Sequence, residues 1–301
     1  MYQIKNILCP TDFSASSVAA IHAIGSLAKA VDGEITLLYV DEYEKTVPCQ
    51  FLGSEEHVRN HRHKIEDRAR EQCATLISTA GLDPARTRIR VRFGTAYQEI
   101  ISEAEQDLYS VVAFSVLGLG CSSPHLIGRT AERIIRLCRT PVLTLRPGEH
   151  GGPLKFESIL CPTDFSEYGN YALPYAISIA KEFQAKLILV HAAPISATQP
   201  ELLLCKFPDP VIYHEGADEI RVERIVGRDI EPENTIVRIA EEEHIDLIIM
   251  GTHGARGMRR VQIGNTTEEV IRRVGVPVLS VTHPIHKMIF PRRFTGESQN
   301  V

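Results

Sequence analysis

The segment ILCPTDFS occurs twice in this chain, at Ile7–Ser14 and again at Ile159–Ser166. A second pair of matching segments follows: GRTAERIIRLCRTPVLTL begins at Gly128, and GNTTEEVIRRVGVPVLSV begins at Gly264. An identical stretch of this length does not recur by chance in a chain of 301 residues. The sequence therefore predicts an internal duplication, with one copy of the same fold in each half of the chain.

The length fits this duplication, because 301 residues are more than one compact domain usually holds. The segment RPGEHGGP supplies turn-forming residues for a short linker at Pro147–Pro153. We therefore expect a first domain at 1–147, a second domain at 154–283 and a polar C-terminal tail at 284–301. Each domain is long enough to bury its own hydrophobic core.

The composition is that of an ordinary soluble globular protein, with 44% hydrophobic and 24% charged residues. The formal net charge of −5 gives no electrostatic reason to expect nucleic acid, and no apolar run approaches the roughly 20 residues that cross a bilayer. The seven cysteines are scattered without a C-x-x-C pair, which favours reduced thiols. We therefore expect a cytoplasmic protein with neither nucleic acid nor a membrane as its partner.

Short apolar runs alternate with amphipathic stretches in each half. In the second half the runs are ESIL, KLILVHA, IRVERIV, LIIM and VPVLSV, and the stretches between them include YALPYAISIAKEF and NTIVRIAEEEH. The stretches place apolar residues three and four positions apart, as helices do, while the runs are continuously apolar, as parallel strands between two helix layers are. The sequence therefore predicts an α/β fold of two tandem doubly wound parallel sheets, whose ligands bind beyond the carboxyl ends of the strands.

The strongest candidate for a binding site follows LIIM, in the segment GTHGARGMRRVQIGNTTEE at Gly251–Glu269. Glycine lets a backbone approach oxygen atoms closely, and the unpaired N–H groups at a helix start favour an anion. Asn265 or Thr266 could donate a further hydrogen bond, and three arginines add positive charge nearby. The alternative interpretation is a glycine-rich turn capped by Asn265 or Thr266 that binds no ligand.

A resemblance to a known family, carried by the glycine motif, decides between these interpretations. No G-x-x-x-x-G-K-[ST] segment of a Walker loop is present. The pattern G-x2-G-x9-G, fitted by Gly251, Gly254 and Gly264, instead resembles the nucleotide motif of the universal stress protein family, with Asn265 where serine or threonine is usual. The repeated ILCPTDFS resembles the family's first strand and its adenine-side aspartate. The resemblance covers nearly the whole chain and implies two tandem Rossmann-like domains of the adenine nucleotide α-hydrolase-like fold.

The resemblance implies an ATP site in the second half, with Mg²⁺ as an accompanying ion, in a protein of the stress response. Adenine would lie near Asp164, and the ribose and phosphates would lie on the glycine-rich loop. No catalytic residue is implied, so we expect slow hydrolysis or none; a slow ATPase and an interaction scaffold without nucleotide stay open as alternatives. The residues implied in binding are Pro162, Thr163, Asp164, Ala192, Met250, Gly251, Gly254, Arg256, Gly264, Asn265 and Thr266.

The first half departs from this motif. Ser115 stands where the second half has Gly251, and Arg129 stands where it has Asn265. A side chain at position 115 could crowd a phosphate, and Arg129 could either fill the phosphate space or bind an anion itself. We therefore expect a degenerate site in the first half, formed by Asp12, Val40, Ser115, Gly118, Gly128, Arg129 and Thr130.

The last apolar segments of the two halves, TPVLTL and VPVLSV, are candidates for a contact between the domains. Domains of the family commonly pair through their last strands, so the resemblance implies that these segments pair within one chain. A homodimer stays open as a further level of association. The sequence indicates no particular protein partner.

His57 and His61 lie four residues apart in a segment with helical periodicity, Glu55–Ala80, that only the first half contains. This spacing is typical of metal ligands on a helix. No third or fourth ligand is evident, however, and the flanking residues are strongly charged. The preferred interpretation is therefore a solvated helix face, with a metal site as the weaker alternative.

Overall fold

The computed structural model describes residues 2–42, 55–106, 108–119, 126–146, 153–197, 199–213, 217–253 and 265–284. The first half forms β1 (Asn6–Thr11), α1 (Ala15–Ala30), β2 (Glu34–Asp41), α3 (Glu55–Thr79), the short 3-10 helix η2 (Pro84–Arg86), β3 (Thr87–Phe93), α4 (Ala96–Ala104), β4 (Val111–Ser115), α5 (Arg129–Leu137) and β5 (Val142–Leu145). The second half forms β6 (Ser158–Pro162), α6 (Glu167–Asn170), α7 (Leu173–Phe183), β7 (Lys186–Ala193), η3 (Pro200–Lys206), α8 (Pro210–Tyr213), η4 (Ala217–Glu219), β8 (Val222–Arg228), α9 (Pro232–Glu242), β9 (Leu247–Gly251), α10 (Asn265–Arg273) and β10 (Val278–Val281).

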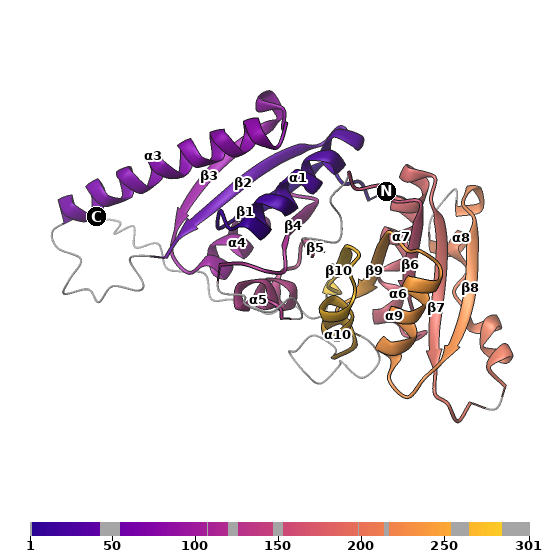
Figure 1. The fold of residues 1–301 in the computed structure, drawn as a ribbon. Helices are drawn as coiled ribbons and strands as arrows, with labels where there is room; N and C mark the ends of the chain where they lie inside the picture. Colours follow the sequence, from indigo (N-terminus) through magenta and orange to yellow (C-terminus); the bar gives the residue numbers. More distant parts are fainter. Residues whose placement is uncertain are drawn as a thin grey trace, which may run out of the picture.

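Both halves contribute to one ten-stranded sheet with the order β3-β2-β1-β4-β5-β10-β9-β6-β7-β8 (Figure 1). The strands within each half are parallel, and each half has the strand order of a doubly wound sheet. The buried side chains form two clusters, one on each face: α1, α3 and α7 cover one face, and α4, α5, α9 and α10 cover the other. The predicted fold of two tandem doubly wound α/β domains is confirmed.

The edge strands differ from the predicted pattern of continuously buried strands. In β9, which lies inside the sheet, the four residues Leu247–Met250 are all buried. In the edge strand β8, Gly227 alone is fully buried, and the other edge strand, β3, exposes Arg88 and Arg90. The strand predicted at IRVERIV is present as β8, but its expected burial was wrong, because an edge strand lies at the margin of the helix layers and carries long charged side chains toward solvent.

The two halves meet through the antiparallel pair β5 and β10. Leu279 of β10 lies directly opposite Leu143 of β5, and both side chains are buried. Thr144 Oγ1 also donates a hydrogen bond to the carbonyl oxygen of Val278 at 3.1 Å. Backbone pairing and apolar burial therefore join the halves into one continuous sheet rather than leaving two separate units.

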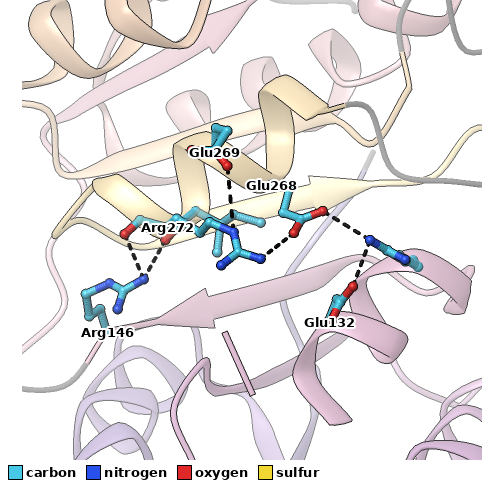
Figure 2. Close-up of polar contacts among 7 residues, drawn as sticks. Glu132, Arg146, Glu268, Glu269 and Arg272 are labelled. Carbon is cyan, nitrogen blue, oxygen red and sulfur yellow. Dashed lines mark hydrogen bonds and ion pairs between the residues drawn. The ribbon is translucent and has the colours of Figure 1, made fainter. Parts of the chain in front are cut away.

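Charged side chains of α5 and α10 meet beside this strand pair (Figure 2). Arg136 contacts Glu132 at 2.7 Å and Glu268 at 3.1 Å, while Arg272 contacts Glu268 at 2.5 Å. Burial alone would raise the pKa of Glu268, but the hydrogen bonds from Arg272 and Arg136 outweigh it and hold the pKa of this carboxyl below its usual range. The contact therefore favours the ionised form of Glu268.

This ion-pair cluster predicts that acid weakens the contact between the halves. Because the pKa of Glu268 is lower in the folded chain, its stabilising contribution is fully present above the ordinary pKa of 4.5 and is lost as the pH falls through the lowered value. We expect Glu268→Gln to lower the free energy of unfolding at neutral pH by on the order of 1 kcal/mol. The difference from wild type should shrink as the pH falls below 4.5 and should vanish once Glu268 is protonated in the folded chain as well.

Urea unfolding of wild type and Glu268→Gln, measured at a series of pH values, checks this expectation. Glu269→Gln is the matched control on the same helix, because Glu269 makes only a longer contact of 3.8 Å to Arg272. A difference between wild type and Glu268→Gln that stays constant through the acid range would contradict the role assigned to Glu268.

In the described part of the chain, no helix is long and apolar enough to cross a membrane. Cys9 and Cys161, which precede a proline in the first strand of each half, are buried in the core. Burial raises the pKa of both thiols, that of Cys161 to about 12. Neither side chain is therefore a reactive thiolate at neutral pH.

Candidate functional site

The TDFS part of the repeated segment folds into a tight turn after β1. Thr11 Oγ1 accepts a hydrogen bond from the backbone N–H of Phe13 at 3.1 Å, and Asp12 Oδ1 accepts one from the backbone N–H of Ser14 at 3.0 Å. Phe13 lies in the left-handed region with a φ of 59°, which is rare for a bulky residue. The threonine and aspartate side chains therefore stabilise a backbone conformation that the chain would otherwise avoid.

The second copy repeats this turn after β6. Thr163 Oγ1 accepts from the backbone N–H of Phe165 at 2.9 Å, Asp164 Oδ1 accepts from that of Ser166 at 3.0 Å, and Phe165 has a φ of 64°. Ser166 then caps α6 by accepting a hydrogen bond from Gly169 N. The identity of the two copies thus has a local structural cause, which the sequence pattern alone did not reveal.

Both turns lie where a doubly wound sheet binds its ligands. The strand order reverses beside the first strand of each half, because β1 lies between β2 and β4, and β6 lies between β7 and β9. Ligands of such sheets bind at this point, beyond the carboxyl ends of the strands. Asp12 directly follows β1 and Asp164 lies two residues after β6, so both stand at the expected edge of the sheet.

In the second half the Asp164 turn packs against the end of β9. A Cβ atom added at Gly169 would collide with Asp164 Oδ1, and one added at Gly251 would lie 3.0 Å from the carbonyl oxygen of Tyr168. Glycine at both positions therefore lets α6 approach Asp164 on one side and the start of the glycine-rich segment on the other. Gly251 thus has a packing role that the sequence motif did not indicate.

Helix α10 begins beside the end of β9, held there by Thr267, which the sequence analysis did not single out. Thr267 Oγ1 donates a hydrogen bond to the carbonyl oxygen of Gly251 at 2.9 Å. The buried hydroxyl of Thr252 lies 2.9 Å from His253 Nδ1 and donates to Thr282 Oγ1 at 3.2 Å. The one available signal was the threonine-rich start of the helix, NTT, since threonine is typical of helix starts.

The other predicted residues of the second half lie in different surroundings. Asn265 and Thr266 open α10, as expected for the helix after the glycine-rich segment. Pro162 ends β6 and Ala192 is next to last in β7, at the same edge of the sheet. The side chain of Met250 is buried in the core, so Met250 could contact a ligand only through its backbone. Outside the described residues lie Gly254, Arg256 and Gly264.

In the first half the loop after β4 lies across Asp12. Asp12 Oδ2 accepts a hydrogen bond from the backbone N–H of Leu119 at 2.9 Å, and a Cβ atom added at Gly118 would lie 2.8 Å from the same oxygen. Since Oδ1 already accepts from Ser14, the protein's own backbone engages both carboxylate oxygens. A ligand that contacted the Asp12 carboxylate would therefore share its oxygens with the backbone of this loop.

The remaining positions of the first-half site also make local contacts. Ser115 is buried at the end of β4, and its Oγ accepts a hydrogen bond from the backbone N–H of Leu117 at 3.1 Å. The backbone N–H of Gly128 donates to a carbonyl just beyond β4 at 2.8 Å, which brings the start of α5 to the strand end. Arg129 and Thr130 are exposed at that helix start, and Val40 is partly buried in β2.

His191 lies beside the Asp164 turn, and the sequence analysis did not single it out. His191 Nδ1 lies 2.8 Å from the carbonyl oxygen of Thr163, and its ring stacks on Phe165 with centroids 4.1 Å apart. In the first half Tyr39 packs against Phe13 in the corresponding place, at 5.1 Å. An aromatic side chain from the second strand thus supports the left-handed phenylalanine in both halves.

The weaker metal interpretation concerned His57 and His61 on α3. His61 belongs to the described residues, whereas the side chain of His57 does not. No group of three or more histidine, cysteine, aspartate or glutamate side chains in the described ranges is arranged to hold a metal ion. The described part of α3 therefore adds no further ligand to this pair.

Two doubly wound α/β domains, joined through antiparallel fifth strands and carrying one TDFS turn at each reversal of strand order, define a duplicated Rossmann-like protein. The sequence profile of the universal stress protein family matches residues 3–146 and 155–282. These matches cover most of the chain. The protein therefore belongs to the universal stress protein family and contains two of its domains in tandem, as the resemblance implied.

Individual relatives agree with this assignment. Universal stress protein Slr1230 from Synechocystis is 24% identical over 305 residues, which cover 92% of this chain and 99% of the relative. Universal stress protein MJ0531 from Methanocaldococcus jannaschii is 31% identical over 145 residues, or 43% of this chain and 84% of the relative. A crystal structure of a universal stress protein from Archaeoglobus fulgidus superimposes with a TM-score of 0.70 at 25% identity, covering 93% of this chain and 99% of that one.

Proposed function

We propose that this protein binds ATP, with Mg²⁺, in its second half and acts as a regulatory protein of the stress response in the cytoplasm. Hydrolysis is slow or absent. The observation that carries this function is the meeting of three features at the strand-order reversal of the second half: the Asp164 turn, the end of β9 at Gly251 and the start of α10. The functional units are 1–147, 154–283 and the tail 284–301.

The phosphate side of this site rests on the chemistry of a helix start. The first N–H groups of an α-helix lack partners within the helix, and the helix dipole favours an anion there. The side chain of Asn265 adds a hydrogen-bond donor, and Arg256 adds positive charge in the preceding segment. Gly254 and Gly264 would let the backbone approach phosphate oxygens closely. Together these groups favour a triphosphate over a neutral ligand.

The base side rests on the residues that follow β6 and β7. Asp164 offers a carboxylate that can accept hydrogen bonds from an amino group or a hydroxyl group. Pro162, Thr163 and the backbone of Ala192 lie at the same edge of the sheet and form its surroundings. The Asp164 turn is held by its own side-chain hydrogen bonds and by Gly169, so its position is set before any ligand arrives.

The first half acts as a scaffold rather than as a second site. Both oxygens of the Asp12 carboxylate accept hydrogen bonds from the protein's own backbone, from Ser14 and from Leu119. The phosphate side carries Arg129 in place of the amide donor Asn265. The pairing of β5 with β10 supports a duplication in which the two halves associate within one chain. A homodimer would then have to use other surfaces.

The nucleotide that remains on gently purified protein, identified and counted per chain, tests this function. We expect about one adenine nucleotide per chain, lost in Gly254→Val and retained in Gly118→Val, the equivalent change in the first half. Titration with ATP and Mg²⁺ measures the same site after the nucleotide has been removed. Two nucleotides per chain would contradict the restriction to the second half. If neither measurement detects a nucleotide, the proposed ATP binding fails, and the alternative of an interaction scaffold that binds no nucleotide remains.

A further inference from the structure

Two arginines of the first half contact α10, the helix whose first turn is the proposed phosphate site of the second half. From these contacts we infer that Arg146 and Arg136 are positioning residues: the first half holds the phosphate-binding helix in place. This role rests on the proposed function, and it gives a half without a working site of its own a reason to remain attached.

Arg146 holds the C-terminal end of α10. Its Nη2 donates hydrogen bonds to the carbonyl oxygens of Ile271 at 2.8 Å and Arg272 at 3.1 Å (Figure 2). These carbonyls belong to the last turn, whose oxygens have no partner within the helix. The Arg146 side chain is buried, so its charge faces the negative end of the helix dipole with little screening by solvent. One side chain thus satisfies two carbonyls and complements the dipole.

Arg136 holds the middle of the same helix. It lies on α5 of the first half and contacts Glu268 of α10 at 3.1 Å, while Glu132 of its own helix holds the guanidinium from the other side at 2.7 Å. Arg272 contacts Glu268 as well. The carboxylate is therefore held between an arginine of each half, and rotation or sliding of α10 would break these contacts.

The support from Arg146 has no equivalent in the opposite direction. When Gly128 is aligned with Gly264, the residue equivalent to Arg146 is Thr282. Thr282 accepts a hydrogen bond from Thr252 within its own half. The short threonine side chain contacts only a residue of its own half here, whereas the longer Arg146 side chain contacts the other half. At this position, therefore, an arginine of the first half holds the helix of the half that keeps the glycine motif.

A fixed C-terminal end also fixes the start of this helix. Helix α10 runs from Asn265 to Arg273, which corresponds to about 13 Å at the rise of an α-helix. An element this short behaves as a rigid rod, so its first turn moves with its last. Holding the last turn in place lowers the ordering cost that phosphate binding would otherwise carry. Removal of Arg146 should therefore weaken binding without touching the ligand.

The test compares wild type, Arg146→Ala, Arg146→Lys and the control Arg139→Ala by hydrogen exchange of the α10 amides in nucleotide-free protein and by titration with ATP and Mg²⁺. Arg139 belongs to the same half, and its described ion pair is with Glu105. We expect Arg146→Ala to accelerate exchange in α10 about tenfold, with α5 unchanged, and to weaken ATP binding about tenfold. Arg146→Lys, which keeps the charge and one donor, should recover part of both losses.

The two measurements separate this inference from the proposed function. If wild type binds no ATP, the proposed function fails, and exchange of the α10 amides in Arg146→Ala still decides whether Arg146 positions the helix. Unchanged exchange in α10 would overturn the inference, as would an equal effect in Arg139→Ala. Faster exchange throughout both halves would likewise overturn it, because it would show a general loss of stability instead of a local one.

Discussion

Replacing Glu103 by alanine is expected to lower the free energy of unfolding by about 2–3 kcal/mol. The Glu103 carboxylate lies on α4 with only 1% of its side chain exposed. It accepts hydrogen bonds from Arg92 and from the Tyr109 hydroxyl, the latter at 3.0 Å, and Arg90 lies 3.9 Å away. Alanine would remove the carboxylate that accepts hydrogen bonds from the Tyr109 hydroxyl and from the partly exposed Arg92, and would also open a cavity.

Urea unfolding of the variants by circular dichroism measures this effect. Glu105→Ala is the matched control, because Glu105 ends the same helix and makes a partly exposed contact of 3.9 Å to Arg139. We expect this control to cost less than about 1 kcal/mol. The aligned position of the second half holds the buried Ile239, so Glu103→Ile tests whether packing can replace the charge. A loss below about 1 kcal/mol in Glu103→Ala would contradict the assigned role.

Replacing Asp164 by alanine is expected to weaken ATP binding by about 10- to 100-fold, the range for loss of a hydrogen bond to a charged group. The carboxylate is proposed to face the base side of the nucleotide, at the reversal of strand order in the second half. The equivalent change in the first half, Asp12→Ala, should leave the affinity unchanged, because the Asp12 carboxylate is bonded to Ser14 and Leu119.

Calorimetric titration with ATP and Mg²⁺, after removal of bound nucleotide, compares the two variants with wild type. Both lose the hydrogen bond that holds the TDFS turn, so each controls for the loss of turn stability in the other. Thermal unfolding without ligand should therefore show similar losses in both. Weaker binding in Asp12→Ala with full binding in Asp164→Ala would place the site in the first half. Equal weakening in both would assign the effect to the turn and not to the ligand.

Repetition in the sequence was sufficient to predict the architecture. The two copies of ILCPTDFS, the paired PVL segments and the alternation of apolar runs with amphipathic stretches predicted two doubly wound domains, and the described elements follow that order. Such patterns are local, since strand and helix periods depend on neighbours within a few residues. The same reasoning failed at the edge strand β8, because coverage of a strand depends on where it lies in the sheet.

Motifs in the sequence also predicted which residues form the candidate site, but not which residues surround them. Asp164 and Gly251 were predicted from motifs, and the structure brings them together through Gly169 and Tyr168, which no motif indicated. The left-handed Phe165 and the supporting ring of His191 were missed for a similar reason. A backbone conformation stabilised by side-chain hydrogen bonds and by packing leaves no periodic signal in the sequence.

By itself the sequence determined the duplication, the fold class and the residues at the ends of the strands, because these follow from local order along the chain. Only the tertiary structure decided which distant residues these positions contact in each half. The bond from Leu119 to Asp12 spans 107 positions, and the bond from Arg146 to Ile271 spans 125. Contacts between residues so far apart depend on how helices and strands pack. For this reason the order of residues along the chain did not predict that the backbone of Leu119 binds Asp12 or that Arg146 holds α10.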